Sequence, residues 1–303
     1  MINRVIEVAT DGAHISVERG FMAVSVGGER QGQVALNDVG ALVVHGHGAT
    51  FSANLVSRLA ERGVPVVICG SNHAPIALVW PMDGHYEQGL RMRAQADASR
   101  PMQKRLWRDL VRSKLTAQAA VLAAAGEPYD ALRDLAKRVR SGDPENVEAQ
   151  AARRYWPLMM GTDFRRDRDA DGVNALLNYG YIVLRAATAR AIVAAGLHPS
   201  LSIHHQSRGN ALRLADDLME PFRPYVDNIV RRLWKDGSDE LDRDVKATLA
   251  AVTILDLEGP RGVAPLQTCL DRLAQSLAQV YLGEAERLAL PSPPPALFGA
   301  SVM

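Results

Sequence analysis

The chain changes character near residue 81, and this change limits the folds that are open to it. Before that point, short apolar runs alternate with glycine and other turn formers, as short strands require. After it, longer stretches carry apolar residues at helical spacing. A block of strands followed by a block of helices favours an α+β protein with separate domains over an alternating α/β fold.

The front of the chain, residues 1–80, is predicted to be a small β-rich, β-sandwich-like domain. Gly27 and Gly28 supply a tight turn between two strands, and Thr50 or Ser52 caps a single helix that ends at Gly63. The strands are predicted over 13–17, 21–26, 34–36, 41–45, 64–69 and 76–80.

Residues 81–90 contain Pro and Gly and are predicted to be a linker, after which 91–290 form a larger all-α domain. The Pro-rich residues 291–303 are expected to be a mobile tail. With 47% hydrophobic residues, the chain can build a sizeable core. Helices are predicted over 90–125, from Asp143 and Pro144 to Trp156 with an interruption at Pro157, over 173–195, over 210–234 with breaks at Pro221 and Pro224, after Ser238, and over 266–281.

Cysteine use and hydropathy indicate a cytoplasmic protein. Cys69 and Cys269 are far apart and lie outside any Cys-x-x-Cys spacing, so both are expected to be reduced core residues. The N-terminus lacks the apolar run of a signal peptide. No apolar stretch approaches the roughly 18–20 residues of a membrane span. The net charge of +1 requires that any binding of a polyanion comes from local basic patches.

A cluster of histidines and acids stands in the second half of the chain. His204 and His205 precede Asp216, Asp217 and Glu220, and arginines alternate with these acids. Imidazole and carboxylate groups bind divalent metals, and arginine binds phosphate. Mg²⁺ prefers oxygen ligands, whereas Mn²⁺ also accepts an imidazole. Asp217 and Glu220 are three residues apart and share a helix face, and Asp216 is a weaker candidate for it. The pattern favours metal-assisted chemistry on a phosphodiester.

Three segments together resemble a known protein family. They are EAQAARRYW from Glu148, VNALLNYGYIVLR from Val173, and GLHPSLSIHH from Gly196, which is followed by DLMEPFRP. With these motifs the chain resembles the CRISPR-associated integrases of the universal spacer-acquisition family, above all members from type II systems. The resemblance covers almost the whole chain. The chain departs from the family pattern at His198, where many members have Asp, and at Ser202, where many have Gly.

The resemblance implies an active site in which Glu148, His205 and Glu220 hold a Mg²⁺ or Mn²⁺ ion. It implies an integrase and endonuclease that joins the 3′-hydroxyl of short foreign DNA to a CRISPR repeat by transesterification. Duplex or branched DNA is then the substrate. Members of the family form homodimers through the β-rich domain, and two such dimers clamp a dimer of a small adaptor protein in a heterohexamer.

Other residues near the motifs have alternative roles. Without the resemblance, Glu148 would be interpreted as a solvated helix residue. His204 is interpreted as a neighbour of the site that bonds DNA or a carboxylate. Asp217 either orients a metal ligand or acts as a charge at a helix N-terminus. Asn178 and Tyr179 either form hydrogen bonds in the core or line the site.

Basic residues recur at near-helical spacing around Trp107, and they form either a solvated face balanced by Asp109 or a track for phosphates. They are Arg100, Lys104, Arg105, Arg108, Arg112 and Lys114. Because only 5% of the residues are aromatic, binding should depend on backbone charge and DNA shape. The predicted DNA contacts are Lys104, Arg108, Arg153, Arg154 and Arg223. Packing or surface roles are predicted for four histidines without acidic neighbours, His45, His47, His73 and His85.

Two other functions compete with integration. A non-catalytic DNA-binding scaffold of the same fold is disfavoured because the Glu148, His205 and Glu220 set is intact. A metal-dependent phosphoesterase that acts on another, small substrate is disfavoured because no compact Gly-rich phosphate loop is present and the arginines are spread over many predicted helices.

Overall fold

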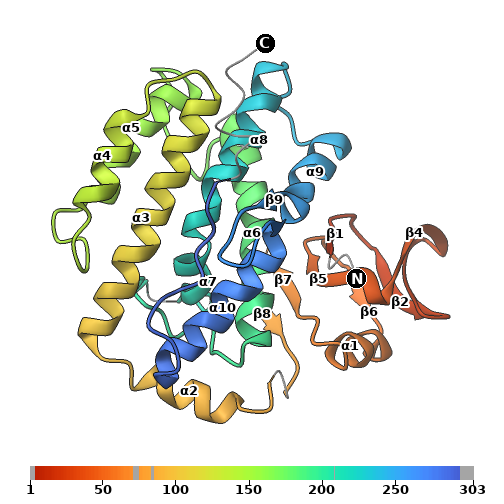
Figure 1. Ribbon diagram of the computed structural model, residues 1–303. Coiled ribbons are helices and arrows are strands. Elements are labelled where there is room, and N and C mark those ends of the chain that lie inside the picture. The colour runs from red at the N-terminus through yellow and green to blue at the C-terminus, as the bar shows by residue number, and fades with distance from the viewer. Residues whose placement is uncertain (1–3, 71–74, 83–84, 208, 294–303) are drawn as a thin grey trace.

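The expected α+β layout is confirmed. The computed structural model describes residues 4–70, 75–82, 85–207 and 209–293. Figure 1 shows the strands of the N-terminal part grouped on one side of the molecule, with the helices forming a larger body beside them.

In its described residues, the N-terminal domain contains two four-stranded sheets and one α-helix. In the first sheet, three parallel strands are followed by an antiparallel fourth, in the order β1 (Arg4–Val8), β5 (Val39–Val44), β7 (Val66–Cys69) and β8 (Pro75–Val79). The second sheet has the order β4 (Glu29–Ala35), β3 (Phe21–Val26), β2 (His14–Glu18) and β6 (Thr50–Phe51). The 3-10 turn η1 (Leu36–Asp38) and the helix α1 (Ala53–Ala60) complete this domain.

Strand β5 links the two domains because its alternate side chains enter different cores. Leu42 and Val44 join the core between the two sheets, where α1 also packs. Ala41 and Val43 join the core of the helical domain. Successive side chains of a strand point to opposite faces of its sheet, so β5 is buried from end to end.

The sequence predicted most of this domain, with errors at its edges. Gly27 and Gly28 both have positive φ and turn the chain between β3 and β4, as expected. Ser52 caps α1 by accepting a hydrogen bond from the Leu55 backbone, whereas Thr50 belongs to β6. Strand β1 was not predicted, and β4 is longer than expected because it pairs with β3 along its whole length.

The helical domain is built around α6, which Figure 1 shows between α3 on one side and the strands on the other. A two-stranded ladder of β9 and β10 corrects the all-α expectation. In chain order the elements are α2 (Gln88–Ala96), α3 (Arg100–Ala124), α4 (Asp130–Arg138), α5 (Val147–Met160), α6 (Val173–Ala194), α7 (Arg213–Leu218), η2 (Glu220–Phe222), α8 (Arg223–Lys235), α9 (Arg243–Ala250), η3 (Ala251–Ile254), β9 (Asp256–Leu257), β10 (Ala264–Pro265) and α10 (Leu266–Leu282).

Several predicted helix boundaries are wrong for local reasons. The segment 90–125 is split into two helices because Ser99 caps α3 and Pro101 lies in its first turn. Helix α4 was not predicted. Helix α5 starts at Val147, capped by Asn146, and it continues through Pro157 to Met160.

Three further differences lie toward the C-terminus. Pro221 lies in η2, as the predicted break requires, but Pro224 begins α8 rather than breaking it. Asp242, not Ser238, caps α9. The Ser292 backbone amide donates to the Glu258 carbonyl over 2.8 Å, so the Pro-rich segment pairs with the body at this point. The rest of the predicted tail, 294–303, lies outside the described residues.

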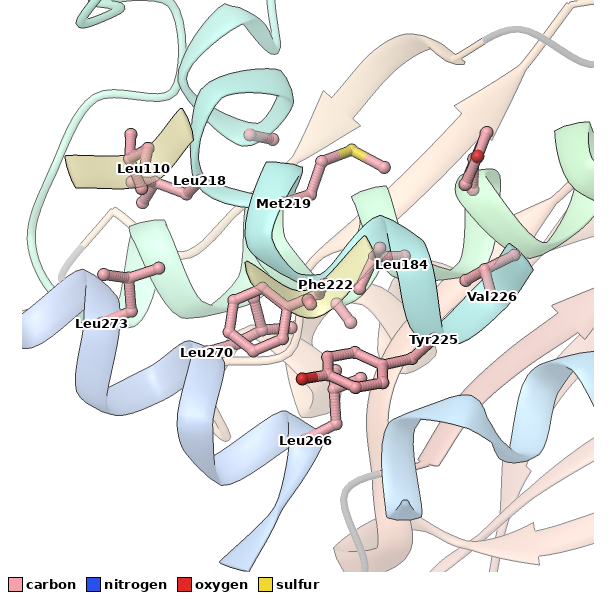
Figure 2. Close-up of a cluster of buried hydrophobic side chains, with 14 of the residues drawn as sticks. Leu110, Leu184, Leu218, Met219, Phe222, Tyr225, Val226, Leu266, Leu270 and Leu273 are labelled. Carbon is pink, nitrogen blue, oxygen red and sulfur yellow. The ribbon is translucent and has the colours of Figure 1, made fainter. Parts of the chain in front are cut away.

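A dense apolar cluster fixes the segment around η2. Figure 2 shows Phe222 and Tyr225 among leucines of α10, with Leu184 of α6 beside them. Phe222 is fully buried, and Leu218 and Met219 are 1% exposed. Burying such side chains stabilises the fold by about 1.5–3 kcal/mol each. The packing therefore holds Glu220, which directly precedes Pro221 and Phe222, in a defined position.

Both cysteines are free thiols, as expected, and burial raises the pKa of each. Among the helices that the structure describes, none has the length and apolar character needed to cross a bilayer.

Candidate metal and DNA site

Two of the three predicted metal ligands meet at one lysine. Glu148 lies in the first turn of α5 and Glu220 in η2, and both elements pack against α3. Lys114 of α3 places its Nζ atom 2.6 Å from Glu148 Oε1 and 2.6 Å from Glu220 Oε2. We call Glu148 and Glu220 the carboxylate pair. Residues far apart in the sequence thus hold a single cation between them.

The start of α5 fixes the position of Glu148. The two carboxylate oxygens of Asp143 accept the backbone N–H groups of Val147 and Glu148, at 2.9 and 3.0 Å. Asn146 caps the helix by accepting from Ala149. Asp143 was predicted as the cap itself, but it acts from a turn that precedes the helix. These bonds satisfy amides that a helix N-terminus leaves unpaired, so the first turn is rigid.

His205 is oriented by Asp217. Its Nδ1 atom lies 2.7 Å from Asp217 Oδ1, and the buried carboxylate also accepts the backbone N–H groups of Ile203 and His204. This hydrogen bond raises the pKa of His205. Since Nδ1 is engaged, Nε2 is the ring nitrogen that remains for a metal or a phosphate. Asp217 lies in the last turn of α7, next to its final residue Leu218, so the alternative of a charge at a helix N-terminus does not apply.

If His205 binds a divalent metal, the conservative change Asp217→Asn is expected to weaken that binding by about 10- to 100-fold, which is typical when the residue behind a ligating histidine is lost. An amide would hold the histidine in the other tautomer or leave it unoriented. Activity and Mn²⁺ affinity should be measured together, with Asp216→Asn as the neighbouring comparison. Equal effects of the two changes would contradict the specific role of Asp217.

His204 does not join the carboxylate pair. Its ring stacks flat on Trp107, with ring centres 4.2 Å apart and an angle of 3° between the planes. Burial lowers the pKa of His204. The neighbouring ring of His205 meets the same indole edge-on at 5.6 Å. The Trp107 ring therefore contacts both histidine rings and helps to fix their positions.

A buried network lies behind Glu220. Arg223 Nε is 3.1 Å from Glu220 Oε1, and the Arg223 guanidinium lies over the Tyr181 ring at 4.7 Å. The hydroxyls of Tyr181 and Tyr155 both donate to Asp227, which is 1% exposed. Burial raises the pKa of Asp227 to about 6. The network holds Arg223 in place. This residue was predicted as a DNA contact, but in the structure it forms an ion pair with Glu220.

The raised pKa of Asp227 predicts a specific pH dependence of stability. Because the folded protein holds this proton more tightly than the unfolded chain, Asp227 stabilises the fold less as the pH rises from about 4 to about 6. The free energy of unfolding relative to Asp227→Asn should fall across that window by as much as about 3 kcal/mol. Denaturant titrations at each pH measure it, with the exposed Asp236→Asn as control. A flat difference across the window would refute the assignment.

The donor set fits a divalent cation in kind. It offers two carboxylates and one imidazole, and the side chain of Glu220 is only 4% exposed. Although burial opposes it, Arg223 and Lys114 hold the pKa of Glu220 below its ordinary value. In the described residues, however, no three His, Cys, Asp or Glu side chains are already arranged to hold an ion. The Lys114 ammonium lies between the two carboxylates instead.

For Asn178 and Tyr179 the structure shows the alternative of hydrogen bonding within the fold. Asn178 accepts from Arg166 over 2.6 Å and donates to the Arg168 carbonyl, so it fastens the loop before α6. The Tyr179 hydroxyl donates to Glu7 of β1, which joins the two domains. Residues at adjacent helix positions point about 100° apart. For this reason Tyr181, two positions further on, faces the network instead.

Two acid–base pairs correct other expectations. Asp216 forms a two-pronged ion pair with Arg185, at 2.7 and 3.1 Å, and is not available as a ligand. His45 was predicted to lack acidic partners, but its Nε2 atom lies 3.2 Å from Glu7 Oε1. Strand β1, missed in the sequence, places Glu7 next to β5.

The predicted DNA contacts do not lie on one surface. Lys104 lines a groove of about 490 Å³ that runs past His204 and His205, together with Arg100, Gln103 and Gly142. We call this the entrance groove. Arg108 pairs with Asp109 and faces a second groove of about 800 Å³, which Arg105, Arg112 and Arg287 also line. The pairing of Arg108 with Asp109 agrees with the alternative of a face balanced by Asp109.

Arg153 and Arg154 are exposed on α5. They lie about 140° and 240° around the helix from Glu148, so neither shares its face. Lys114, assigned to the basic face of α3, is instead only 14% exposed. The sequence could not reveal this, because a lysine at helical spacing looks the same whether it meets solvent or two glutamates.

The fold joins a strand-rich N-terminal part to a larger helical body, in which Glu148 and Glu220 meet at Lys114 and Asp217 orients His205. The family model of the CRISPR associated protein Cas1 matches residues 6–256. The CRISPR-associated endonuclease Cas1 of Neisseria meningitidis serogroup C is 34% identical over 286 residues, which cover 93% of each chain. The chain therefore belongs to the Cas1 family.

Solved structures show the same fold. A casposase bound to its integration product has a TM-score of 0.77 at 20% identity, covering 95% of this chain and 93% of that one. A Cas6-RT-Cas1–Cas2 complex has a TM-score of 0.71 at 18% identity, covering 93% of this chain and 35% of that one. The resemblance predicted from the three motifs is thus confirmed.

Proposed function

We propose that this protein is a metal-dependent DNA integrase and endonuclease that inserts short foreign DNA into a CRISPR array. The observation that carries the proposal is the meeting of Glu148 and Glu220 around one cation, with the Asp217-oriented His205 in the adjoining loop. The names of the relatives, an endonuclease and a casposase bound to an integration product, support the same reaction class.

Glu148, His205 and Glu220 would hold Mg²⁺ or Mn²⁺ after Lys114 moves aside. When bound, such an ion polarises the scissile phosphate and makes the attacking hydroxyl more acidic. Asp217 keeps the His205 ring fixed, and Arg223 keeps one oxygen of Glu220 occupied. Since one phosphodiester replaces another, strand joining needs no ATP.

The DNA would approach through the entrance groove. Lys104 and Arg100 line it and can contact backbone phosphates, which gives affinity without reading sequence. His204, whose ring stacks on the buried Trp107, lines this groove next to His205. A positively charged approach would then lie beside His205, one of the three proposed ligands.

The proposed partners are DNA with 3′ ends, the CRISPR repeat, a second copy of the chain and a small dimeric adaptor. A related chain is part of a complex that contains Cas2, which supports an adaptor of that kind. We propose a homodimer through the β-rich domain, and a heterohexamer in which two dimers clamp the adaptor. Free thiols and the absence of a membrane-crossing helix among the described residues support a cytoplasmic location.

Strand transfer tests the proposal. The protein and its adaptor are incubated with a supercoiled repeat-containing plasmid, Mn²⁺ and short duplex DNA that carries either a 3′-hydroxyl or a 3′-deoxy end. Joined product should form only with the 3′-hydroxyl and should vanish with EDTA. DNA binding without joining would favour the scaffold, and hydrolysis of small phosphate esters alone would favour the phosphoesterase.

A further inference from the structure

The Lys114 side chain occupies a position that the proposed metal site needs. Its Nζ atom lies 2.6 Å from one oxygen of each member of the carboxylate pair, and its side chain is only 14% exposed. Glu220 is 4% and Glu148 26% exposed at the side chain. Ligand oxygens lie about 2.0–2.2 Å from Mg²⁺, so an ion shared by these two oxygens would collide with the ammonium.

The charges around the pair are already balanced. Lys114 and Arg223 supply two positive charges against the two carboxylates. A divalent ion added to this neutral cluster would leave it strongly positive in a poorly solvated place, which is unfavourable unless a cation leaves. Arg223 is held over the Tyr181 ring, whereas the four-carbon stem of Lys114 is flexible. Lys114 is therefore the group that moves.

We propose that Lys114 is the resident counter-ion of the carboxylate pair, which holds the site together before the metal arrives and competes with the metal for it. This inference rests on the proposed function, because it concerns the same site. Without Lys114, only Arg223 would remain to balance two neighbouring carboxylates, so Lys114 stabilises the metal-free protein. Its displacement lowers the affinity for the ion, and a DNA phosphate beside the site is the natural acceptor for the displaced ammonium.

The test compares the full chain with Lys114→Met, a variant of similar length that lacks the charge. Metal-free Lys114→Met should melt at least about 6 °C lower, because a buried carboxylate loses its partner. Its Mn²⁺ affinity, measured by calorimetry, should nevertheless rise at least about tenfold. Saturating Mn²⁺ should then raise its melting temperature more than that of the unaltered protein. The same substitution at the exposed Lys137 of α4 is the control and should change neither quantity.

Each outcome decides the question. If Lys114→Met is unfolded without metal, Mn²⁺ should restore its folding, and failure to do so overturns the proposal. Unchanged or weaker Mn²⁺ binding by a folded Lys114→Met also overturns it, while binding by the unaltered protein leaves the proposed function standing. If neither protein binds Mn²⁺, the proposed metal site falls together with this inference.

Discussion

Replacing Glu148 with glutamine should reduce DNA strand transfer at least about 100-fold. Loss of a residue that only hydrogen-bonds a metal ligand lowers metal affinity or activity about 10- to 100-fold, and loss of a ligand itself should have a larger effect. The amide keeps the shape of the side chain but removes the negative charge that a divalent ion requires. His205→Ala should have an effect of the same size, because it removes the imidazole. The folded state should survive both changes.

DNA binding separates this result from a structural one. Affinity for duplex DNA should change less than about threefold in either variant, since phosphate contacts come from Lys and Arg side chains. Glu145→Gln, at an exposed glutamate three residues before Glu148, is the matched control and should retain full activity. Strand transfer that persists in both Glu148→Gln and His205→Ala would remove the site assignment.

Replacing Phe222 with alanine should destabilise the helical domain by about 3–5 kcal/mol, which is the usual effect of truncating a fully buried aromatic side chain. The ring packs among leucines of α10 and belongs to η2, which begins at Glu220 (Figure 2). Its loss therefore also allows Glu220 to move. Urea unfolding measures the change in free energy. Phe21→Ala, at a ring that is 40% exposed, should change stability far less.

A loss below about 1 kcal/mol in Phe222→Ala would show that the core around η2 is not what positions the site. Strand transfer gives a second readout at a temperature where the variant is still folded. There, activity should fall because Glu220 is displaced, while DNA affinity stays close to that of the unaltered protein.

Sequence patterns predicted the architecture because they are local. Strand alternation, glycine turns and helical spacing gave the α+β layout, and Gly27 and Gly28 turn the chain as expected. Boundaries failed where a cap or a pairing partner decided them. Ser99 splits one predicted helix, and β1 exists because it pairs with β5.

The candidate site was predictable only through the resemblance. The spacing of Glu148 and Glu220 in the sequence does not show that they meet. They come together because the elements that carry them both pack against α3, where Lys114 contacts both. The same reason hides Lys114, whose neighbours in sequence belong to a basic helix face. The tertiary partners of Arg223 and Tyr179, which are Glu220 and Glu7, could not be predicted, because a charge or a hydroxyl in a helix does not reveal its partner.

The most direct test of the central claim is a crystal of the protein soaked with Mn²⁺ and measured for anomalous scattering. We expect one strong peak about 2.0–2.3 Å from a carboxylate oxygen of Glu148, a carboxylate oxygen of Glu220 and Nε2 of His205, with the Lys114 ammonium withdrawn. A peak bound by other residues, or none at saturating Mn²⁺ with Lys114 still between the glutamates, would contradict the account.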